Sequence, residues 1–293
     1  MNARDRPLWV RALLWVLAVV LMLGAAVYQR RTGPTYPLRG QFEVAGERYS
    51  YKLIRSEYSS TDARVLIPDP GAGTTGRLHY RRYKTRDEFT SVLMQVADGE
   101  MFAMLPAQPA AGKLEYYLTL ETPEGALRLP PQATENAIIR FKDEVPVAVL
   151  LAHILLMFFA MLVGMRCGLA AIFAPRGMRV LAWVSLLGMS IGGMILGPIV
   201  QKYAFGAFWT GFPRGYDLTD NKALIMWLVW GVACAVIGLK PRKNELVGRL
   251  VVVAATVVMM TVYLIPHSLR GSELDYSQLD SGVPASEAIT TGD

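Results

Sequence analysis

The chain has 293 residues, of which 53% are hydrophobic, and its formal net charge is +6. This composition is too apolar for a soluble protein with one core. The apolar residues are gathered in blocks, which indicates membrane spans together with one soluble domain. Much of the positive charge lies in short segments beside these blocks, where it indicates membrane topology. It therefore gives no reason to expect a nucleic-acid partner.

Five apolar stretches have roughly the length that crosses a hydrocarbon core of about 30 Å. The first, within residues 1–30, is expected to be an uncleaved anchor, because the small-residue cleavage site of a signal peptide is poorly matched there. The other four fall within residues 145–267 and predict a four-helix membrane bundle. The five predicted spans are 8–28, 145–165, 180–200, 223–239 and 246–265.

Basic residues precede the first span and join the second to the third and the fourth to the fifth. Such short basic segments face the cytoplasm. The sequence therefore predicts a multi-pass protein of a bacterial cytoplasmic (inner) membrane with a cytoplasmic N-terminus. The domain 37–142, the loop 201–222 and the tail 268–293 would lie on the periplasmic side. The basic residues are Arg4, Arg6, Arg11, Arg166, Arg176, Arg179, Lys240, Arg242, Lys243 and Arg249.

Residues 37–142 alternate β-branched and aromatic segments with turn residues, which predicts an all-β sandwich of roughly a hundred residues. Eight strands are expected, at 48–54, 63–67, 77–83, 91–96, 101–105, 113–120, 126–129 and 137–141. A Leu-Pro-Ala-Gln-Pro turn at 105–109 and a Glu-Tyr-Tyr strand at 115–117 resemble those of bacterial immunoglobulin-like or fibronectin-III-like domains. His79 on an alternating strand is expected to have a structural role. The domain has no cysteine, so disulfides do not hold it together.

Cys167 and Cys234 both fall in or near membrane spans. No Cys-x-x-Cys-His motif is present, so the chain is not itself a c-type cytochrome. In the third span, Gly188 and Gly192, and then Gly193 and Gly197, are spaced four residues apart. This spacing lets a neighbouring helix approach closely and favours a packed bundle over separate anchors.

The strongest functional signal is the loop 201–222, QKYAFGAFWTGFPRGYDLTDNK, which joins two predicted spans. His153 and His267, two of the three histidines, lie on spans that end on the same side as this loop. Histidine within a span is costly and by default faces protein or a cavity. Each histidine has an ordinary structural alternative, a hydrogen bond to a neighbouring helix or a place at the interface. Together they suggest axial ligands of a heme.

The order of histidine, external aromatic loop and histidine resembles the heme-handling proteins of cytochrome c maturation. Gly206, Phe208, Trp209 and Asp217 match the pattern of their tryptophan-rich loop, whereas Phe205 stands where the first tryptophan is expected. The resemblance implies an inner-membrane protein that binds or presents heme for cytochrome assembly or electron transfer. His153 and His267 would ligate iron, and Lys202 and Arg214 would meet the propionates. The aromatic shelf would be Phe205, Phe208, Trp209, Phe212 and Tyr216.

Two other functions stay open. The chain is either a non-catalytic accessory or scaffold subunit, with a sandwich that docks membrane or periplasmic subunits such as cytochromes, or a membrane enzyme with Asp217 or Asp220 as a base. No hydrolase or transferase motif supports the enzyme. Asp217, Asp220 and Asn221 precede the fourth span, where they would cap the helix or hold a cation. From Ser277 the composition predicts a flexible terminus.

Overall fold

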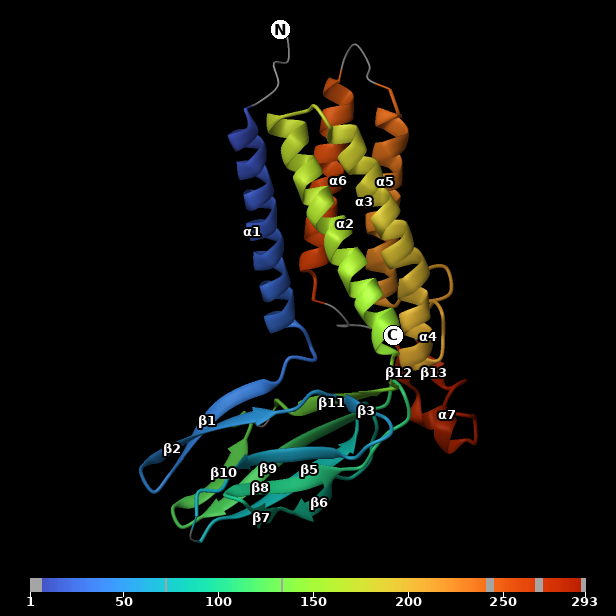
Figure 1. Cartoon of the computed structure of the whole chain (residues 1–293). Helices are drawn as coiled ribbons and strands as arrows, with labels where there is room; N and C mark the ends of the chain where they lie inside the picture. The colour runs from blue at the N-terminus through green and yellow to red at the C-terminus, as the bar shows by residue number, and fades with distance from the viewer. Residues whose placement is uncertain (1–6, 72, 133, 241–244, 267–270, 291–293) are drawn as a thin grey trace. The chain divides into compact units, whose positions relative to one another are not determined.

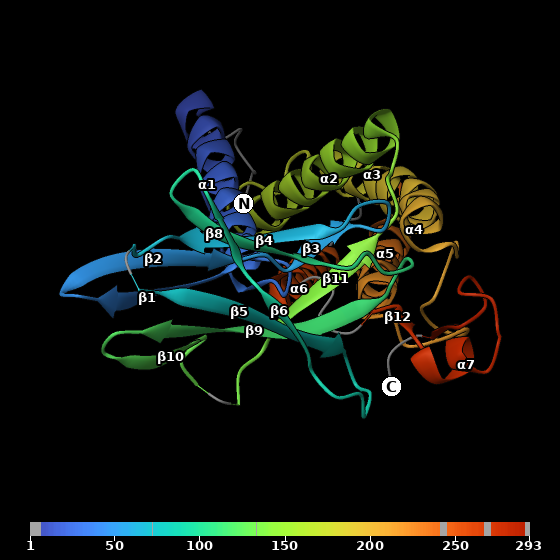
Figure 2. The ribbon, with the colours of Figure 1, turned by 90° about the horizontal axis from the view of Figure 1, so that it is seen from below.

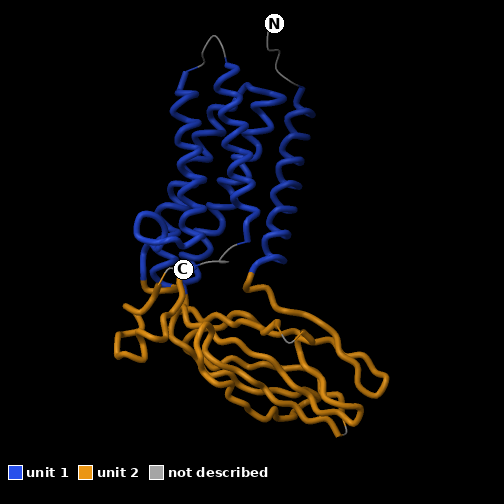
Figure 3. The backbone as a smooth tube through the Cα atoms, turned by 180° about the vertical axis from the view of Figure 1, so that it is seen from behind, with its two compact units in different colours: residues 1–33, 145–203, 207–271 blue, residues 34–144, 204–206, 272–293 orange. Residues whose placement is uncertain are grey.

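The computed structural model describes residues 7–71, 73–132, 134–240, 245–266 and 271–290. The chain divides into two compact units, coloured blue and orange in Figure 3. The membrane unit comprises Met1–Gly33, Val145–Tyr203 and Ala207–Gly271, and the β unit comprises Pro34–Glu144, Ala204–Gly206 and Ser272–Asp293. Each unit is described by itself below.

Five helical segments of the chain are long and apolar enough to cross a membrane. They are labelled in Figure 1. This confirms the prediction of five apolar helices of spanning length, with somewhat longer bounds than expected. The helices are α1 (Leu8–Thr32), α2 (Val147–Phe173), the continuous segment of α3 (Met178–Met189), η1 (Ser190–Leu196) and α4 (Gly197–Phe205), α5 (Leu218–Ile237) and α6 (Leu246–Leu264).

Helix α2 contacts α1, α3, η1 and α6, so it is the shared partner of most of the membrane unit. The predicted glycine face of the third span lies against it. A Cβ atom on Gly188 would come within 2.8 Å of Ala160, and one on Gly192 within 3.1 Å of Leu156. The close approach expected from the glycine spacing is therefore confirmed, and α2 is the helix that approaches.

The structure adds a π-helical turn, η1, that the sequence did not predict. In η1 the Gly197 N–H donates to the carbonyl of Gly192, five residues earlier. A π-turn of this kind interrupts the regular i to i−4 ladder and is frequent at functional sites. The Gly192 carbonyl is also the partner of His153, so the turn and the histidine are one structural feature.

The β unit is all-β apart from one short helix and a few residues of α4. Strands β3, β11, β9, β5 and β6 form one sheet in that order, with β10 paired to β9, and β4, β8 and β7 form a second. Figure 2 looks onto these strands from below. The bounds are β1 (Leu38–Val44), β2 (Glu47–Leu53), β3 (Ser56–Tyr58), β4 (Ala63–Pro68), β5 (Thr75–Arg82), β6 (Thr90–Leu93), β7 (Gln95–Ala97), β8 (Glu100–Leu105), β9 (Lys113–Thr122), β10 (Gly125–Leu129) and β11 (Ala137–Lys142).

Pairing is antiparallel except between β3 and β11, which run parallel, and β1 pairs only with β2. The sheets share one hydrophobic core, but they do not close on one another. A separate all-β region is thus confirmed, and its likeness to an immunoglobulin sandwich stays a prediction. One strand expected at 91–96 is divided between β6 and β7, because the Met94 N–H donates to the Gly76 carbonyl and its side chain is buried.

Strand β9 is the centre of this core. Its alternate side chains Leu114, Tyr116, Leu118 and Leu120 are buried, as the period-2 pattern of a half-buried strand requires. The Tyr116 hydroxyl donates to the Ile54 carbonyl at 2.7 Å, which satisfies the one polar atom of that side chain. Burial raises the pKa of Tyr116 far above its usual value.

His79 on β5 has the structural surroundings that the sequence predicts. Its ring stacks on Tyr117 with centroids 4.7 Å apart, and its Nε2 lies 2.9 Å from the Thr119 hydroxyl. Burial lowers the pKa of this half-buried imidazole. These contacts give the ring a packing role.

The C-terminal segment differs from the flexible tail that was expected. It forms β12 (Glu273–Leu274), α7 (Tyr276–Asp280) and β13 (Ile289–Thr290), and it belongs to the β unit. Asp275 caps α7 by accepting from the Ser277 and Gln278 N–H groups, and Leu274, Tyr276 and Ala288 are buried. A few anchoring side chains therefore order a segment whose average composition is that of a loose terminus.

Candidate functional site

The predicted aromatic loop joins α4 to α5 and is held in place by Asp220. One carboxylate oxygen of this buried residue accepts the backbone N–H of Thr210 at 2.7 Å and of Gly211 at 3.1 Å. The Thr210 hydroxyl in turn accepts from the side-chain amide of Gln201 at 2.7 Å. Charge-assisted bonds to backbone N–H groups are the stronger kind, so these contacts fix the middle of the loop to both flanking helices.

Asn221 supplies a second anchor, since its side-chain oxygen accepts the Phe212 N–H at 2.7 Å. Gly211 packs directly on these anchors. A Cβ atom there would lie 2.7 Å from the Cβ of Asp220 and 2.9 Å from the Asn221 oxygen. No side chain fits at that position, so glycine is required for the loop to reach the helix.

Asp217 is the N-cap of α5, and its carboxylate accepts the N–H groups of Thr219 at 2.8 Å and Asp220 at 3.4 Å. The capping interpretation is therefore confirmed for Asp217. Among the residues that the structure describes, no group of three or more His, Cys, Asp or Glu side chains could hold a metal ion. Both carboxylates act as acceptors inside the loop, and the alternative of a catalytic base stays a prediction.

The predicted shelf residues do not share one environment. Phe208, Phe212 and Tyr216 are 57%, 64% and 72% exposed, so they project away from the anchored backbone. Trp209 is half-buried, and its indole N–H donates to the Phe212 carbonyl at 3.0 Å. Phe205 belongs to the β unit, where the Arg140 guanidinium lies 4.1 Å from its ring centroid.

The predicted propionate partners also lie near the loop. The Lys202 ammonium is 5.7 Å from the Phe208 ring centroid, and Arg214 is exposed at the tip. Lys222, by contrast, is buried and donates to the Ile265 carbonyl, so it fastens α5 to the end of α6. Lys202 and Arg214 therefore lie at the surface of the membrane unit, whereas Lys222 has a structural contact.

His153 is half-buried on α2, with Nδ1 2.8 Å from the Gly192 carbonyl oxygen. Because a carbonyl only accepts, this contact assigns the proton to Nδ1 and leaves Nε2 as the basic nitrogen. His267 lies outside the described residues. A shared iron between the two histidines therefore stays a prediction.

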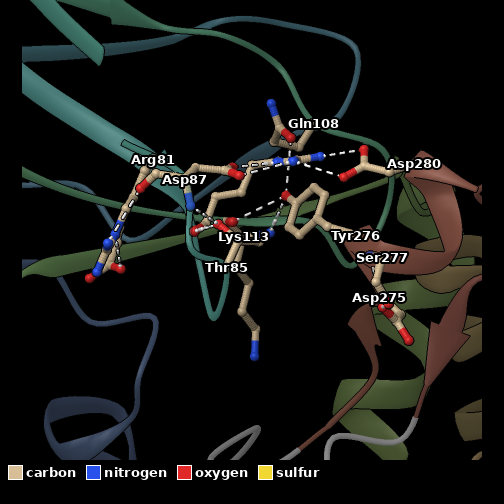
Figure 4. Close-up of polar contacts among 11 residues, drawn as sticks. Arg81, Thr85, Asp87, Gln108, Lys113, Asp275, Tyr276, Ser277 and Asp280 are labelled. Atoms are coloured by element: carbon tan, nitrogen blue, oxygen red, sulfur yellow. Dashed lines mark hydrogen bonds and ion pairs between the residues drawn. The ribbon is translucent and has the colours of Figure 1, made fainter. Parts of the chain in front are cut away.

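A second feature, which the sequence did not single out, is a charged cleft of about 510 Å³ in the β unit. The loop after β5, the start of β9 and the C-terminal segment line it. Figure 4 shows its polar contacts. Arg82 pairs with Asp87 at 2.6 Å and with Asp280 at 2.7 Å, and the Tyr276 ring packs under its guanidinium.

The acidic and basic groups at the heart of this cleft are mutually paired. Lys84 and Lys113 both contact the carboxylate of Glu273, and the Tyr276 hydroxyl accepts the Lys113 N–H at 3.1 Å. Burial acts to raise the pKa of Glu273, but the hydrogen bonds from the two lysines outweigh it and hold the pKa below its usual value. The cleft is thus chiefly the seam that fastens the C-terminal segment to the β-strands.

Sequence reasoning missed this seam because its partners are nearly two hundred residues apart. Arg82 ends β5 and Lys84 follows it, whereas Asp280 and Glu273 belong to a segment with a loop-like composition. The one local signal was Asp275 followed by Ser277 and Gln278, which is typical of a helix N-cap. Neither a scan against models of protein families nor a search of curated proteins finds a match to the chain.

Proposed function

We propose that this chain is a non-catalytic accessory subunit of a membrane complex, which binds membrane or periplasmic partner proteins. The observation that carries the proposal is the construction of the aromatic loop. Its carboxylates accept backbone N–H groups, and its exposed side chains include the aromatic rings of Phe208, Phe212 and Tyr216. A binding surface benefits from a fixed backbone and exposed rings.

The physical reason is preorganisation. Ordering a loop on binding costs free energy, and a loop that is already held by Asp220 and Asn221 avoids much of that cost. Aromatic side chains are enriched in protein interfaces, where they bury a large area with few rotatable bonds. The same rings would also suit a membrane–water interface, so the experiment must separate protein from lipid.

The β unit offers a second surface of the kind that a docking domain requires. On the outer face of the β4–β8–β7 sheet, Leu66 and Met104 are 36% and 42% exposed, and the Arg64 guanidinium lies 4.2 Å from the Phe102 ring centroid. Apolar side chains beside a stacked arginine are a composition that protein interfaces favour.

The test places a photo-activatable amino acid at Tyr216, at Met104 and, as control, at Val232, which is 59% exposed on α5 within a predicted span. The proposal expects a discrete protein adduct from Tyr216 or Met104 in native membranes and lipid adducts alone from Val232. The same partner should co-purify stoichiometrically and be lost in Phe212→Ala with Tyr216→Ala. Lipid adducts at all three positions would contradict a docking role.

A second candidate, heme binding at the same end of the membrane unit, rests on His153. Metal-ligating histidines usually donate their other ring N–H to a carbonyl or carboxylate, and Nδ1 of His153 has the Gly192 carbonyl as such a partner. The fit is partial, since the described residues of the membrane unit supply this one imidazole. His153 and His267 would be the ligands, and heme would supply a one-electron carrier. A Soret band lost in His153→Ala and His267→Ala supports it, and a protein that stays colourless with added heme excludes it.

A further inference from the structure

Arg166 is a buried arginine of the membrane unit, and the described residues give two of its three guanidinium nitrogens no acceptor. It lies on α2 and is 5% exposed. Its Nε and Nη1 atoms have no hydrogen-bond acceptor among the described residues. A guanidinium within a membrane-spanning helix is costly unless an anion, a carbonyl or water meets it, so this side chain points to a ligand.

Two other arginines on helices at that end of the unit, Arg179 and Arg249, have hydrogen-bond acceptors for their guanidinium groups. Arg179 contacts Glu245 at 2.8 Å and the Ile237 carbonyl at 3.2 Å. Arg249 donates to the carbonyls of Ala171 and Ile172, at 2.5 and 2.9 Å, and so caps the end of α2. Arg166 has no equivalent contact at two of its three nitrogens.

The described acidic residues of the membrane unit all have other partners. They are Asp217, Asp220 and Glu245. Glu245 pairs with Arg179, and the two aspartates anchor the aromatic loop, at the opposite end of the helices in Figure 1. None of the described acids is therefore a counter-ion for Arg166.

The surroundings of Arg166 are cationic and aromatic. The Trp15 ring centroid of α1 lies 5.5 Å from its guanidinium carbon. The positive charge of Arg11, one helical turn before Trp15, also acts on Arg166. Two arginines and an indole, contributed by the packed pair α1 and α2, thus form a positive site with an aromatic wall.

The depth of this site matches a lipid headgroup region. Arg166 is seven residues before the end of α2, and Trp15 is seven residues after the start of α1. Both positions are about 10 Å from the same end of the helices at 1.5 Å per residue. Tryptophan is enriched at this level of a membrane, and basic positions between spans on such a side bind anionic headgroups.

We propose that Arg166, with Arg11 and the ring of Trp15, binds a phosphate group between α1 and α2, and that an anionic phospholipid carries it. The guanidinium fork presents two parallel N–H donors that match two phosphate oxygens, which an ammonium does not. One phosphate would bond one edge of the guanidinium, Nε with Nη2 or Nη1 with Nη2, and would join α1 to the rest of the unit. The site is independent of the docking role, since it uses the other end of the helices.

The test uses the full-length protein in a maltoside detergent and a phosphate-free buffer. Phosphatidylglycerol and, separately, inorganic phosphate are titrated while thermal stability and the lipid retained in native mass spectrometry are measured. Arg166→Gln removes the fork, and Arg176→Gln is the matched control, because Arg176 is exposed at the same end. We expect phosphatidylglycerol to bind at least about tenfold more weakly to Arg166→Gln and equally to Arg176→Gln.

Each outcome decides the proposal. If inorganic phosphate alone stabilises the wild type and this is lost in Arg166→Gln, the phosphate site stands and its ligand comes from solution. Equal lipid binding by wild type and Arg166→Gln, or binding of neither ligand, overturns it. If Arg166→Gln does not fold, Arg11→Gln and Arg166→Lys replace it. Both should weaken lipid binding, and unchanged binding in the pair overturns the site.

Discussion

The two units satisfy their polar side chains in different ways. In the membrane unit the partner is usually a backbone carbonyl, as for Ser185 on Ala160 at 2.9 Å and Thr256 on Gly164 at 3.3 Å. In the β unit the charged side chains pair with each other, as Arg81 does with Glu115 at 2.7 Å. Neither pattern is complete, because Arg179 pairs with Glu245 in the membrane unit and Arg128 donates to the Pro130 carbonyl in the β unit.

The difference follows from the solvent of each unit. A helix carbonyl has a second lone pair, so a hydroxyl or guanidinium on a neighbouring helix finds an acceptor without placing another polar side chain in lipid. In the β unit, a partly exposed carboxylate keeps contact with water and has a small desolvation penalty. Charged side chains can therefore pair with each other there. Asp220 also departs from this pattern, because it is a buried carboxylate of the membrane unit that binds backbone N–H groups.

Replacing Asp220 should therefore give the largest effect. Asp220→Ala leaves the N–H groups of Thr210 and Gly211 without their acceptor, and we expect a loss of about 3 kcal/mol in the free energy of unfolding. Thermal unfolding in detergent and hydrogen exchange of the loop amides measure it.

Two variants calibrate that result. Asp220→Asn keeps one carbonyl acceptor and should lose less than Asp220→Ala. Arg214→Ala at the exposed tip should stay within about 0.5 kcal/mol of wild type. If Asp220→Ala exchanged its loop amides no faster than Arg214→Ala, the loop would not depend on its carboxylate anchor.

The second prediction concerns the hydroxyl of Tyr116, which is fully buried in the core of the β unit. Tyr116→Phe removes the bond to the Ile54 carbonyl and leaves that acceptor without this partner, at a cost of about 2 kcal/mol. Hydrogen exchange of the β9 amides at increasing denaturant concentration measures the loss. Tyr58→Phe, on an exposed ring of β3, is the control and should change little. Equal stability of the two variants would show that the buried bond is unimportant.

These side chains also show what the sequence could predict. Apolar length predicts the spans, glycine spacing predicts the close contact with α2, and Asp217 before an apolar helix predicts its cap, because each signal is local. The π-turn at Ser190–Leu196 depends on packing against α2, and the seam at Glu273 depends on residues far along the chain. Neither has a local signature. Arg166 was visible only as a topology signal until its burial was known.

The third prediction tests that seam. Because the folded-state pKa of Glu273 is held below its usual value, its contribution is fully present above the usual carboxyl pKa, near about 4. The contribution is lost as the pH falls through the lowered pKa. We expect Glu273→Gln to reduce hydrogen-exchange protection of Leu274–Asp280 about tenfold at pH 7. The variant should also show a weaker acid dependence than wild type.

Asp98→Asn, in an exposed turn of the β unit, is the matched control, since it removes a carboxylate from outside the seam. It should keep both the protection of the segment and its acid dependence. If Glu273→Gln and Asp98→Asn behaved alike, the two lysine contacts would not hold the C-terminal segment.

The smallest effect should come from a hydroxyl of the membrane unit. Ser185 is fully buried, yet its carbonyl partner on Ala160 lies within α2 and keeps an intrahelical bond when the hydroxyl is removed, so Ser185→Ala should cost only about 0.6 kcal/mol. Ser190→Ala should cost more, because the Trp227 indole N–H, 2.9 Å from that hydroxyl, would lose its acceptor. Unfolding in mixed micelles can rank the two. If Ser185→Ala cost as much as Tyr116→Phe, a helix carbonyl would be no more tolerant of losing a donor than the Ile54 carbonyl, and the contrast between the units would fail.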